Sequence, residues 1–121
     1  MITNEQRARL TETKFFKVEV GQKVRLVLKE WGYREDTFKE ADGNVQVIPT
    51  LSFIVESIND IKVTVPKEWN SRSKTNNIIL LDAIDKAERE GRDFIAVEVF
   101  RINKTQYNIT DLTSMINSYR R

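Results

Sequence analysis

Aromatic and cationic side chains stand close together at three places in this chain of 121 residues. The three places are Lys29 with Trp31, Trp69 with Arg72, and Lys104 with Tyr107. A flat ring can stack on a nucleic-acid base, with a contribution of about 1–3 kcal/mol per base, and a neighbouring cation can neutralise a phosphate. The chemistry that these pairs could supply is therefore the binding of a single strand of nucleic acid, provided that the fold brings them onto one surface.

Further residues of the same kinds flank the predicted strands. Arg25, Lys29 and Trp31 stand at even spacing in one predicted strand, so we expect their side chains to point the same way. The remaining candidates in this group are Tyr33, Arg34, Lys62 and Lys74. Phosphates would then contact Arg25, Lys29, Lys62, Arg72 and Lys104, and bases would stack on Trp31, Tyr33 and Trp69.

The composition removes the commonest catalytic groups. The chain has no cysteine and no histidine, which excludes thiol nucleophiles, zinc–thiolate sites and every Ser-His-Asp arrangement. Acidic residues gather in 35–42 and 82–90, but neither group has the spacing of metal ligands. We therefore expect a protein that is not an enzyme and that uses no cofactor and no metal.

The net charge of +2 is too small to indicate polyanion binding by itself. Basic residues recur along the predicted strands while acidic ones gather on the predicted helix, and this asymmetry can create a basic groove. No stretch approaches the roughly 18 consecutive apolar residues that cross a bilayer. Because Met1–Leu10 also lacks the apolar core of a secretory signal, we expect a cytoplasmic protein without a membrane partner.

Apolar residues alternate in several stretches that predict strands. Phe15–Val20 and Val24–Trp31 predict one long first strand with a turn or bulge at Gly21. Later elements are predicted as strands over Val45–Ile58 and Ile61–Val65, a helix over Thr75–Glu90, and strands over Phe94–Ile102 and Gln106–Thr110. The connections are predicted as a hairpin tip over Gly32–Asn44, a tight turn at Asn59-Asp60, a break at Pro66, a polar connection over Trp69–Lys74, and a helix end at Gly91.

Three strands, one helix and two strands is the order of elements in the five-stranded Greek-key barrel called the OB-fold. We therefore predict a mainly β protein with this barrel over residues 14–111 and with its one helix between strands 3 and 4. Residues 1–13 are predicted as an N-terminal arm or short helix, with Thr3 or Asn4 as the N-cap, and residues 112–121 as a C-terminal tail.

The predicted core takes one face of each element. Its members are Val24, Leu26, Leu28, Leu51, Phe53, Val55, Ile78, Leu81, Ile84, Ile95, Val97 and Val99, together with Phe15, Phe16 and Phe94. The aromatic candidates also have structural alternatives. Trp31 could cap the end of the barrel, Trp69 could pack under the helix, and Tyr107 could pack rather than stack.

Four segments carry a resemblance to a known family. They are FFKVEVGQKVRLVL, VIPTLSFIVES, VPKEWNSRSK and FIAVEVFRINKTQYNI. Over Lys14–Thr110 the chain resembles the OB-fold single-stranded-DNA-binding proteins of phages and related prokaryotic elements, archaeal ones included. The resemblance implies DNA contacts at Arg25, Lys29, Trp31, Trp69, Arg72, Arg101, Lys104 and Tyr107. Many such proteins recruit partners through an acidic tail, whereas this chain ends Ser118-Tyr-Arg-Arg121, so we do not expect recruitment of that kind.

The predicted function is non-catalytic binding of single-stranded DNA with low sequence specificity. RNA fits the same chemistry, because a sequence does not locate the polar groups that read a 2′-hydroxyl. The expected partners are single-stranded DNA, replication or repair proteins, and further copies of the chain. The alternative is an OB-fold assembly module that binds no nucleic acid and pairs its exposed sheet edges between copies.

Overall fold

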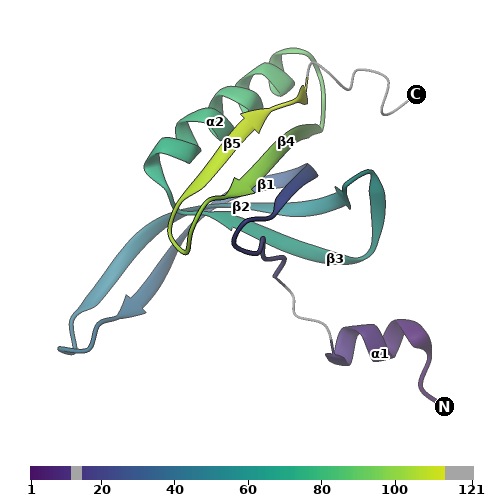
Figure 1. Cartoon of the computed structure of the whole chain (residues 1–121), viewed down its shortest axis with the longest axis horizontal. Helices are drawn as coiled ribbons and strands as arrows, with labels where there is room; N and C mark the ends of the chain where they lie inside the picture. The colour runs from purple at the N-terminus through teal and green to yellow at the C-terminus, as the bar shows by residue number, and fades with distance from the viewer. Residues whose placement is uncertain (12–14, 114–121) are drawn as a thin grey trace.

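The computed structural model describes residues 1–11 and 15–113. Its elements are α1 (Asn4–Thr11), β1 (Lys23–Lys39), β2 (Val45–Ile58), β3 (Ile61–Ser71), α2 (Lys74–Arg89), β4 (Phe94–Arg101) and β5 (Tyr107–Asp111). The prediction of a mainly β protein with one helix between the third and fourth strands is confirmed (Figure 1). In the part of the chain that the structure describes, no helix is long and apolar enough to span a bilayer.

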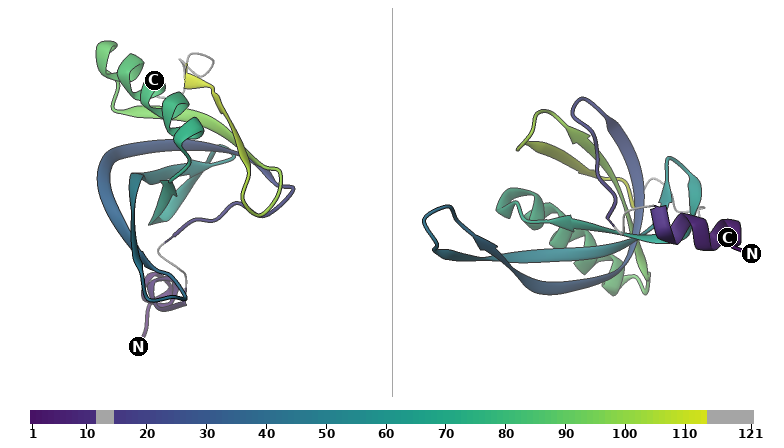
Figure 2. Two further views of the ribbon diagram at one scale, coloured as in Figure 1. Left: turned by 90° about the vertical axis from the view of Figure 1, so that its left-hand side faces the viewer. Right: turned by 90° about the horizontal axis from the view of Figure 1, so that it is seen from below.

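The strands form one antiparallel sheet in the order β3-β2-β1-β4-β5, which Figure 2 shows to be strongly twisted. β1 is the central strand, because Lys23–Lys29 pairs with β4 on one side while most of β1 pairs with β2 on the other. β3 and β5 are the two edges, and no ladder joins them among the described strands. The sheet is therefore open, and the predicted barrel closure is not seen in the described residues.

The first strand begins later than predicted. Gly21 adopts a φ of 83° and turns the chain, as predicted for this glycine, and β1 starts only after it. Residues 15–20, which we call the N-terminal segment, cross between other strands. The Phe16 N–H donates to the Glu68 carbonyl of β3 (2.8 Å), and the Gly21 N–H donates to the Arg101 carbonyl of β4 (2.7 Å). This segment therefore crosses the open side of the sheet.

The prediction of a hairpin tip over Gly32–Asn44 is wrong for most of that stretch. The ladder between β1 and β2 continues as far as the pair Lys39 and Val45, and only 40–44 form the turn. This part of the hairpin projects from the sheet as a two-stranded ribbon (Figure 1). Because residues 37–39 and 45–47 of this ribbon are exposed on both faces, their sequence lacks the alternation typical of a half-buried strand. The β1–β2 arm comprises residues 33–39 and 45–50.

β3 also extends further than predicted. Pro66 lacks an N–H, and the register between β2 and β3 is irregular around it, but pairing resumes at Lys67 and continues to Ser71. Trp69 therefore lies in a strand and not in a polar connection. Pro66 interrupts the ladder without ending it, because the following residues again find partners on β2.

α2 covers one face of the sheet, and its ends agree with the prediction to within one residue. The Ser73 hydroxyl caps the helix by accepting from the Asn76 N–H (3.3 Å). The prediction that Ile78 and Leu81 face the sheet is wrong, since 71% and 49% of these residues are exposed. Residues 78–81 are all apolar, so the pattern fits two helix faces. The observed buried apolar face consists of Leu80, Ala83, Ile84 and Ala87.

The main core lies between α2 and the sheet and includes Val24, Leu26 and Leu28, as predicted. A smaller cluster of Val27, Phe94 and Ala96 lies on the opposite sheet face, because alternate residues of a strand face opposite ways. Of the phenylalanines assigned to the core, Phe53 is fully buried and Phe16 packs against the main core. Phe15 is 48% exposed, so its assignment to the core is wrong.

α1 begins with a capping box. The Gln6 N–H donates to the Thr3 hydroxyl (3.1 Å), and the Thr3 N–H donates to the Gln6 side-chain carbonyl (2.9 Å). This confirms the predicted short helix and selects Thr3 over Asn4 as its N-cap. α1 lies outside the sheet (Figure 1). It has contacts with β3.

Candidate functional site

A groove runs between the end of β3 and the turn that joins β4 to β5. It consists of three adjoining depressions with volumes of about 340, 360 and 410 Å³, and Tyr107 lines all three. The N-terminal segment forms one wall, while the start of α2 and β5 continue the groove. The β3–β5 groove is lined by Phe15, Lys17, Trp69, Asn70, Arg72, Lys104, Thr105 and Tyr107, among others.

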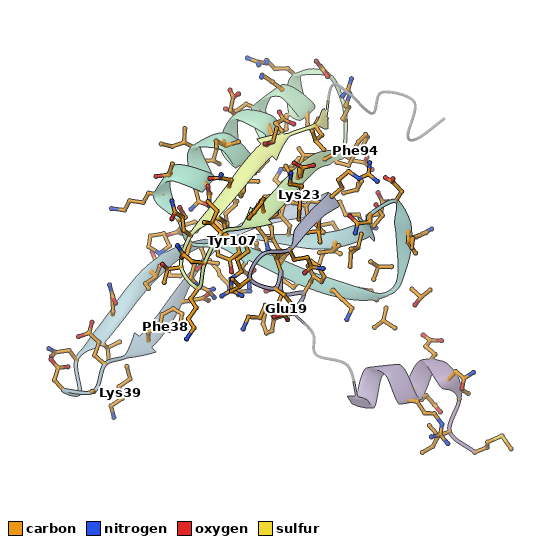
Figure 3. All side chains as sticks on the ribbon, viewed as in Figure 1. Glu19, Lys23, Phe38, Lys39, Phe94 and Tyr107 are labelled. Carbon is orange, nitrogen blue, oxygen red and sulfur yellow. The ribbon has the colours of Figure 1, made fainter. Side chains whose placement is uncertain are left out.

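The groove brings together two of the three predicted aromatic–cation pairs. Trp69 and Arg72 come from β3 and the connection after it, and Lys104 and Tyr107 come from the β4–β5 turn and β5. Figure 3 shows Tyr107 where the β1–β2 arm meets the rest of the sheet. These residues meet because β3 and β5, although far apart in the order of the sheet, both border its open side.

Trp69 lies in the floor of the groove. It is 6% exposed, and its ring centroid lies 5.9 Å from that of Phe53, its cross-strand partner in the main core. A ring held in this way has no free face for a base. The predicted role of Trp69 as a stacking platform therefore does not fit its position, and the structural alternative accounts for it.

Arg101 lies beneath the groove and is 8% exposed. Its guanidinium donates to the carbonyls of Val18 (2.9 Å), Lys104 (2.8 Å) and Asn103 (3.3 Å), and it lies 5.3 Å from the centroid of the Tyr107 ring. These bonds join the N-terminal segment to the β4–β5 turn. Arg101 therefore shapes the groove from below, and its position does not fit direct contact with a phosphate on the surface.

Sequence reasoning missed several residues of the groove, among them Phe15, Lys17 and Asn70. Phe15 and Lys17 are exposed, and Lys17 and Lys104 form no ion pair within the described residues. The adjacent pair Phe15-Phe16 could have indicated that one of the two rings is exposed, because only one of two neighbouring residues in an extended segment can face the core. The Asn70 side-chain oxygen is buried in the wall without a hydrogen-bond partner among the described residues.

A charged cluster joins the base of the β1–β2 arm to the groove. The Asp36 carboxylate accepts from the guanidinium groups of Arg34 (2.7 Å) and Arg72 (2.5 Å) and from the Thr50 hydroxyl (3.0 Å). Arg34 also donates to Glu68 of β3 (2.5 Å). Two cations face two carboxylates, so the arm-base cluster of Arg34, Asp36, Glu68 and Arg72 is close to neutral.

The arm-base cluster shifts the protonation equilibria of its members. Hydrogen bonds from Arg34 and Arg72 hold the pKa of the Asp36 carboxyl well below its usual range. Hydrogen bonds to Asp36 and Glu68 raise the pKa of the Arg34 guanidinium above its usual value. Arg72 also lies 5.3 Å from the centroid of the exposed Phe38 ring, which Figure 3 shows on the arm. Arg34 and Arg72 thus join the β1–β2 arm to β3 and to the connection after it through their bonds to Asp36 and Glu68, without any ligand.

The third predicted pair is separated by a bulge. The register of β1 against β2 shifts between Lys29 and Gly32, and Glu30 adopts a φ of 50°. This extra residue moves the alternation by one position, so Trp31 packs against the main core while Lys29 stays on the opposite face. The prediction that Arg25, Lys29 and Trp31 point the same way is therefore wrong.

Of the other predicted site residues, Arg25, Lys62 and Tyr33 lie away from the groove, whereas Lys74 stands between Ser73 and Thr75, which line it. Arg25 forms an ion pair with Asp60 (2.7 Å), and Lys62 lies in β3 next to the same turn. Lys74 is the first residue of α2. Tyr33 is exposed on the arm, where its hydrogen bond to Glu35 raises the pKa of its hydroxyl.

Among residues 1–11 and 15–113, no three Asp, Glu, His or Cys side chains come close enough to hold a metal ion. No protein-family profile, curated protein or solved structure matches the chain. The function of the chain is therefore inferred from the geometry and chemistry of the groove.

Proposed function

We propose that this chain binds single-stranded DNA, with the β3–β5 groove as its interface and without catalysing a reaction. The observation that carries the proposal is that two exposed cations, the exposed Phe15 ring and the half-buried Tyr107 ring converge on this one groove from separate segments. Phe15 and Tyr107 would stack against bases, while Lys17 and Lys104 would neutralise phosphates. RNA fits the same chemistry.

The finer fold that we infer is an OB-type barrel. In the order β3-β2-β1-β4-β5 the two edge strands are the pair that must meet if the sheet closes. The N-terminal segment stands between them and bonds to Glu68 on one side and to Arg101 on the other. OB-folds bind oligonucleotides on the face of their second and third strands and with the loops that join strands 1 to 2 and strands 4 to 5. The β3–β5 groove shares the end of β3 and the β4–β5 turn with such a surface, and DNA replication or repair is the setting that such binding would serve.

Fluorescence anisotropy of a labelled oligo-dT of about 30 nucleotides tests the interface, because such a strand spans the site size of a single OB-fold. We expect the double variant Lys17→Glu with Lys104→Glu to bind at least about tenfold more weakly, and its salt slope to fall by about 1.4 for two lost phosphate contacts. The matched control, Lys86→Glu with Arg89→Glu, makes the same change of net charge on α2, outside the groove.

The two ways in which this experiment can fail are distinguishable. Absence of binding by the unaltered chain at low salt overturns the function itself. Equal losses in both double variants leave the function standing but refute the groove as its interface. The first result would favour the alternative of an assembly module without nucleic-acid binding, for which the projecting β1–β2 arm is the favouring observation.

A further inference from the structure

We propose that two copies of this chain associate through the outer edge of β1 in the β1–β2 arm. The two edges would pair antiparallel about a two-fold axis at Thr37, so that the two arms form one four-stranded ribbon. This inference does not depend on the proposed function, because the outer edge of β1 takes no part in the β3–β5 groove.

Among the described residues, the outer edge of β1 has no partner strand along the arm. β4 covers β1 only over Lys23–Lys29, whereas β1 continues to Lys39. In the part of the chain that the structure describes, no strand pairs with this edge beyond Lys29. An edge of this kind presents a row of N–H and C=O groups that can pair with another chain.

The hydrogen-bond phase of the arm determines which groups this edge presents. The Glu40 N–H donates to the Asn44 carbonyl (2.7 Å), so these two opposed residues form a hydrogen-bonded pair. Such pairs alternate with non-bonded ones along an antiparallel ladder, and the ladder from Gly32 to Lys39 has no shift. Thr37, which lies opposite Val47, therefore belongs to a non-bonded pair. Its N–H and C=O point to the outer edge, as do those of Glu35 and Lys39.

The outer edge of β2 is less suited to pairing. Pro49 lies opposite Glu35 in a non-bonded pair, so it stands where its N–H would have pointed outward. Proline has no N–H to donate, and proline on an exposed edge is a common device against pairing with another chain. β1 carries no proline in the arm. The structure therefore favours the β1 edge over the β2 edge.

Charge complementarity selects the register. With Thr37 opposite its own copy, Glu35 lies opposite Lys39 of the second copy, and Arg34 lies opposite its Glu40. The two-fold axis repeats both opposite-charge pairs. A register with Asp36 or Glu35 opposite its own copy would instead bring like carboxylates together, which destabilises cross-strand neighbours. An antiparallel two-fold pair about Thr37 is therefore the register that matches the charges of this edge.

Sedimentation velocity without nucleic acid, over a range of protein concentrations, tests the association. We expect a concentration-dependent dimer of twice the 14.2 kDa of one chain. Thr37→Pro removes an outward N–H from the β1 edge and breaks no bond to β2, so it should abolish the dimer. Val47→Pro is the matched control on the same rung, since it removes the outward N–H of the β2 edge, and it should leave the dimer intact.

Charge variants test the register even if a proline disturbs the arm. Lys39→Glu should raise the dissociation constant of the dimer about tenfold, because it places like charges opposite each other twice. Glu35→Lys combined with Lys39→Glu should restore association. Lys62→Glu, with the same change of net charge outside the arm, should have little effect.

Three results would overturn the proposal. The first is a chain that stays monomeric at the highest concentration reached. The second is a dimer that survives Thr37→Pro but not Val47→Pro. The third is a double charge swap that remains as weak as Lys39→Glu alone. None of these results bears on whether the β3–β5 groove binds a single strand.

Discussion

The guanidinium of Arg101 links two segments by hydrogen bonds at a place where no strand ladder joins them among the described residues. It donates to carbonyls on both sides of the seam, from Val18 in the N-terminal segment and from Asn103 and Lys104 in the turn. Its position at the end of a strand beside a turn suggested a surface cation. The side chain is long enough to turn inward instead, and a sequence does not show which carbonyls will be left without donors.

Replacement of this side chain should destabilise the fold. We expect Arg101→Met to lower the free energy of unfolding by about 2–4 kcal/mol, because three carbonyls lose their donor and methionine replaces only the apolar stem. Urea unfolding followed by circular dichroism measures the effect. Arg89→Met, at an exposed position of α2, should change the free energy by less than about 0.5 kcal/mol. Equal midpoints for the two variants would contradict the structural role.

The Asp36 carboxylate should make the fold sensitive to acid. Its pKa is lowered in the folded state by Arg34 and Arg72, so the ionised form is the one that stabilises the fold. This stabilisation is complete above the ordinary aspartate pKa of about 3.9 and is lost as the pH falls below that value. We expect Asp36→Asn to be less stable at pH 7 and to lose less of its remaining stability between about pH 4 and pH 2.

Thermal unfolding at a series of pH values measures this effect. Asp85→Asn, at an exposed position of α2, is the matched control and should follow the pH dependence of the unaltered chain. If Asp36→Asn also follows it, the arm-base cluster does not stabilise the fold.

At the scale of elements, the end of α2 shows that one residue type can be enough to predict where a helix ends. Gly91 adopts a φ of 71°, its N–H donates to the Glu88 carbonyl, and the Arg92 N–H donates to the Ala87 carbonyl. This is the Schellman arrangement, in which the residue after the helix takes a left-handed conformation. The glycine was predicted to end the helix because few other residues adopt that conformation readily.

Two glycines should respond to alanine in opposite ways. Gly91→Ala should lower the free energy of unfolding by about 1 kcal/mol, because a Cβ disfavours the left-handed conformation. Gly32 does not have the positive φ of a left-handed residue, and the nearest atom to a Cβ added there would be the Ser52 hydroxyl oxygen, at 3.6 Å. Gly32→Ala should therefore be neutral or stabilise by up to about 1 kcal/mol. Urea unfolding measures both, and a loss of the same size at Gly32 would contradict this account of Gly91.

The elements that were predicted well are those with one buried face, such as Val24–Leu28 of β1, and those with a local end signal. The bulge was not predictable, because Glu30 is not a glycine and nothing nearby marks its φ of 50°. The bulge at that one residue determines that the Trp31 side chain lies on the face of the sheet that carries the main core. The outer part of the β1–β2 arm was missed for the opposite reason, since residues 37–39 and 45–47 are exposed on both faces and have no core to impose a pattern.

At the scale of the whole molecule, strand order explains which predicted pairs meet. The ends of β3 and β5 both border the open side of the sheet, so Arg72 and Tyr107 share a groove although they are far apart in the sequence. β1 lies at the centre of the sheet and cannot place Trp31 there. The sequence order of the elements is consistent with this arrangement, but neither the sheet order nor the bulge can be obtained from residue types at single positions.

Hydrogen exchange should reveal both the centre and the exposed edge of the molecule. Leu26, whose strand is paired on both sides, should be among the slowest amides to exchange. In dilute protein, the outward Thr37 amide should exchange at least about tenfold faster than its neighbour Phe38, which bonds to β2. At high concentration, pairing of the arms should protect Thr37 and leave Val47 unprotected.

NMR-detected exchange at two protein concentrations measures these differences. Uniform protection along 33–39 at both concentrations would contradict the alternation within the arm, and a concentration effect at Val47 alone would assign the association to the wrong edge.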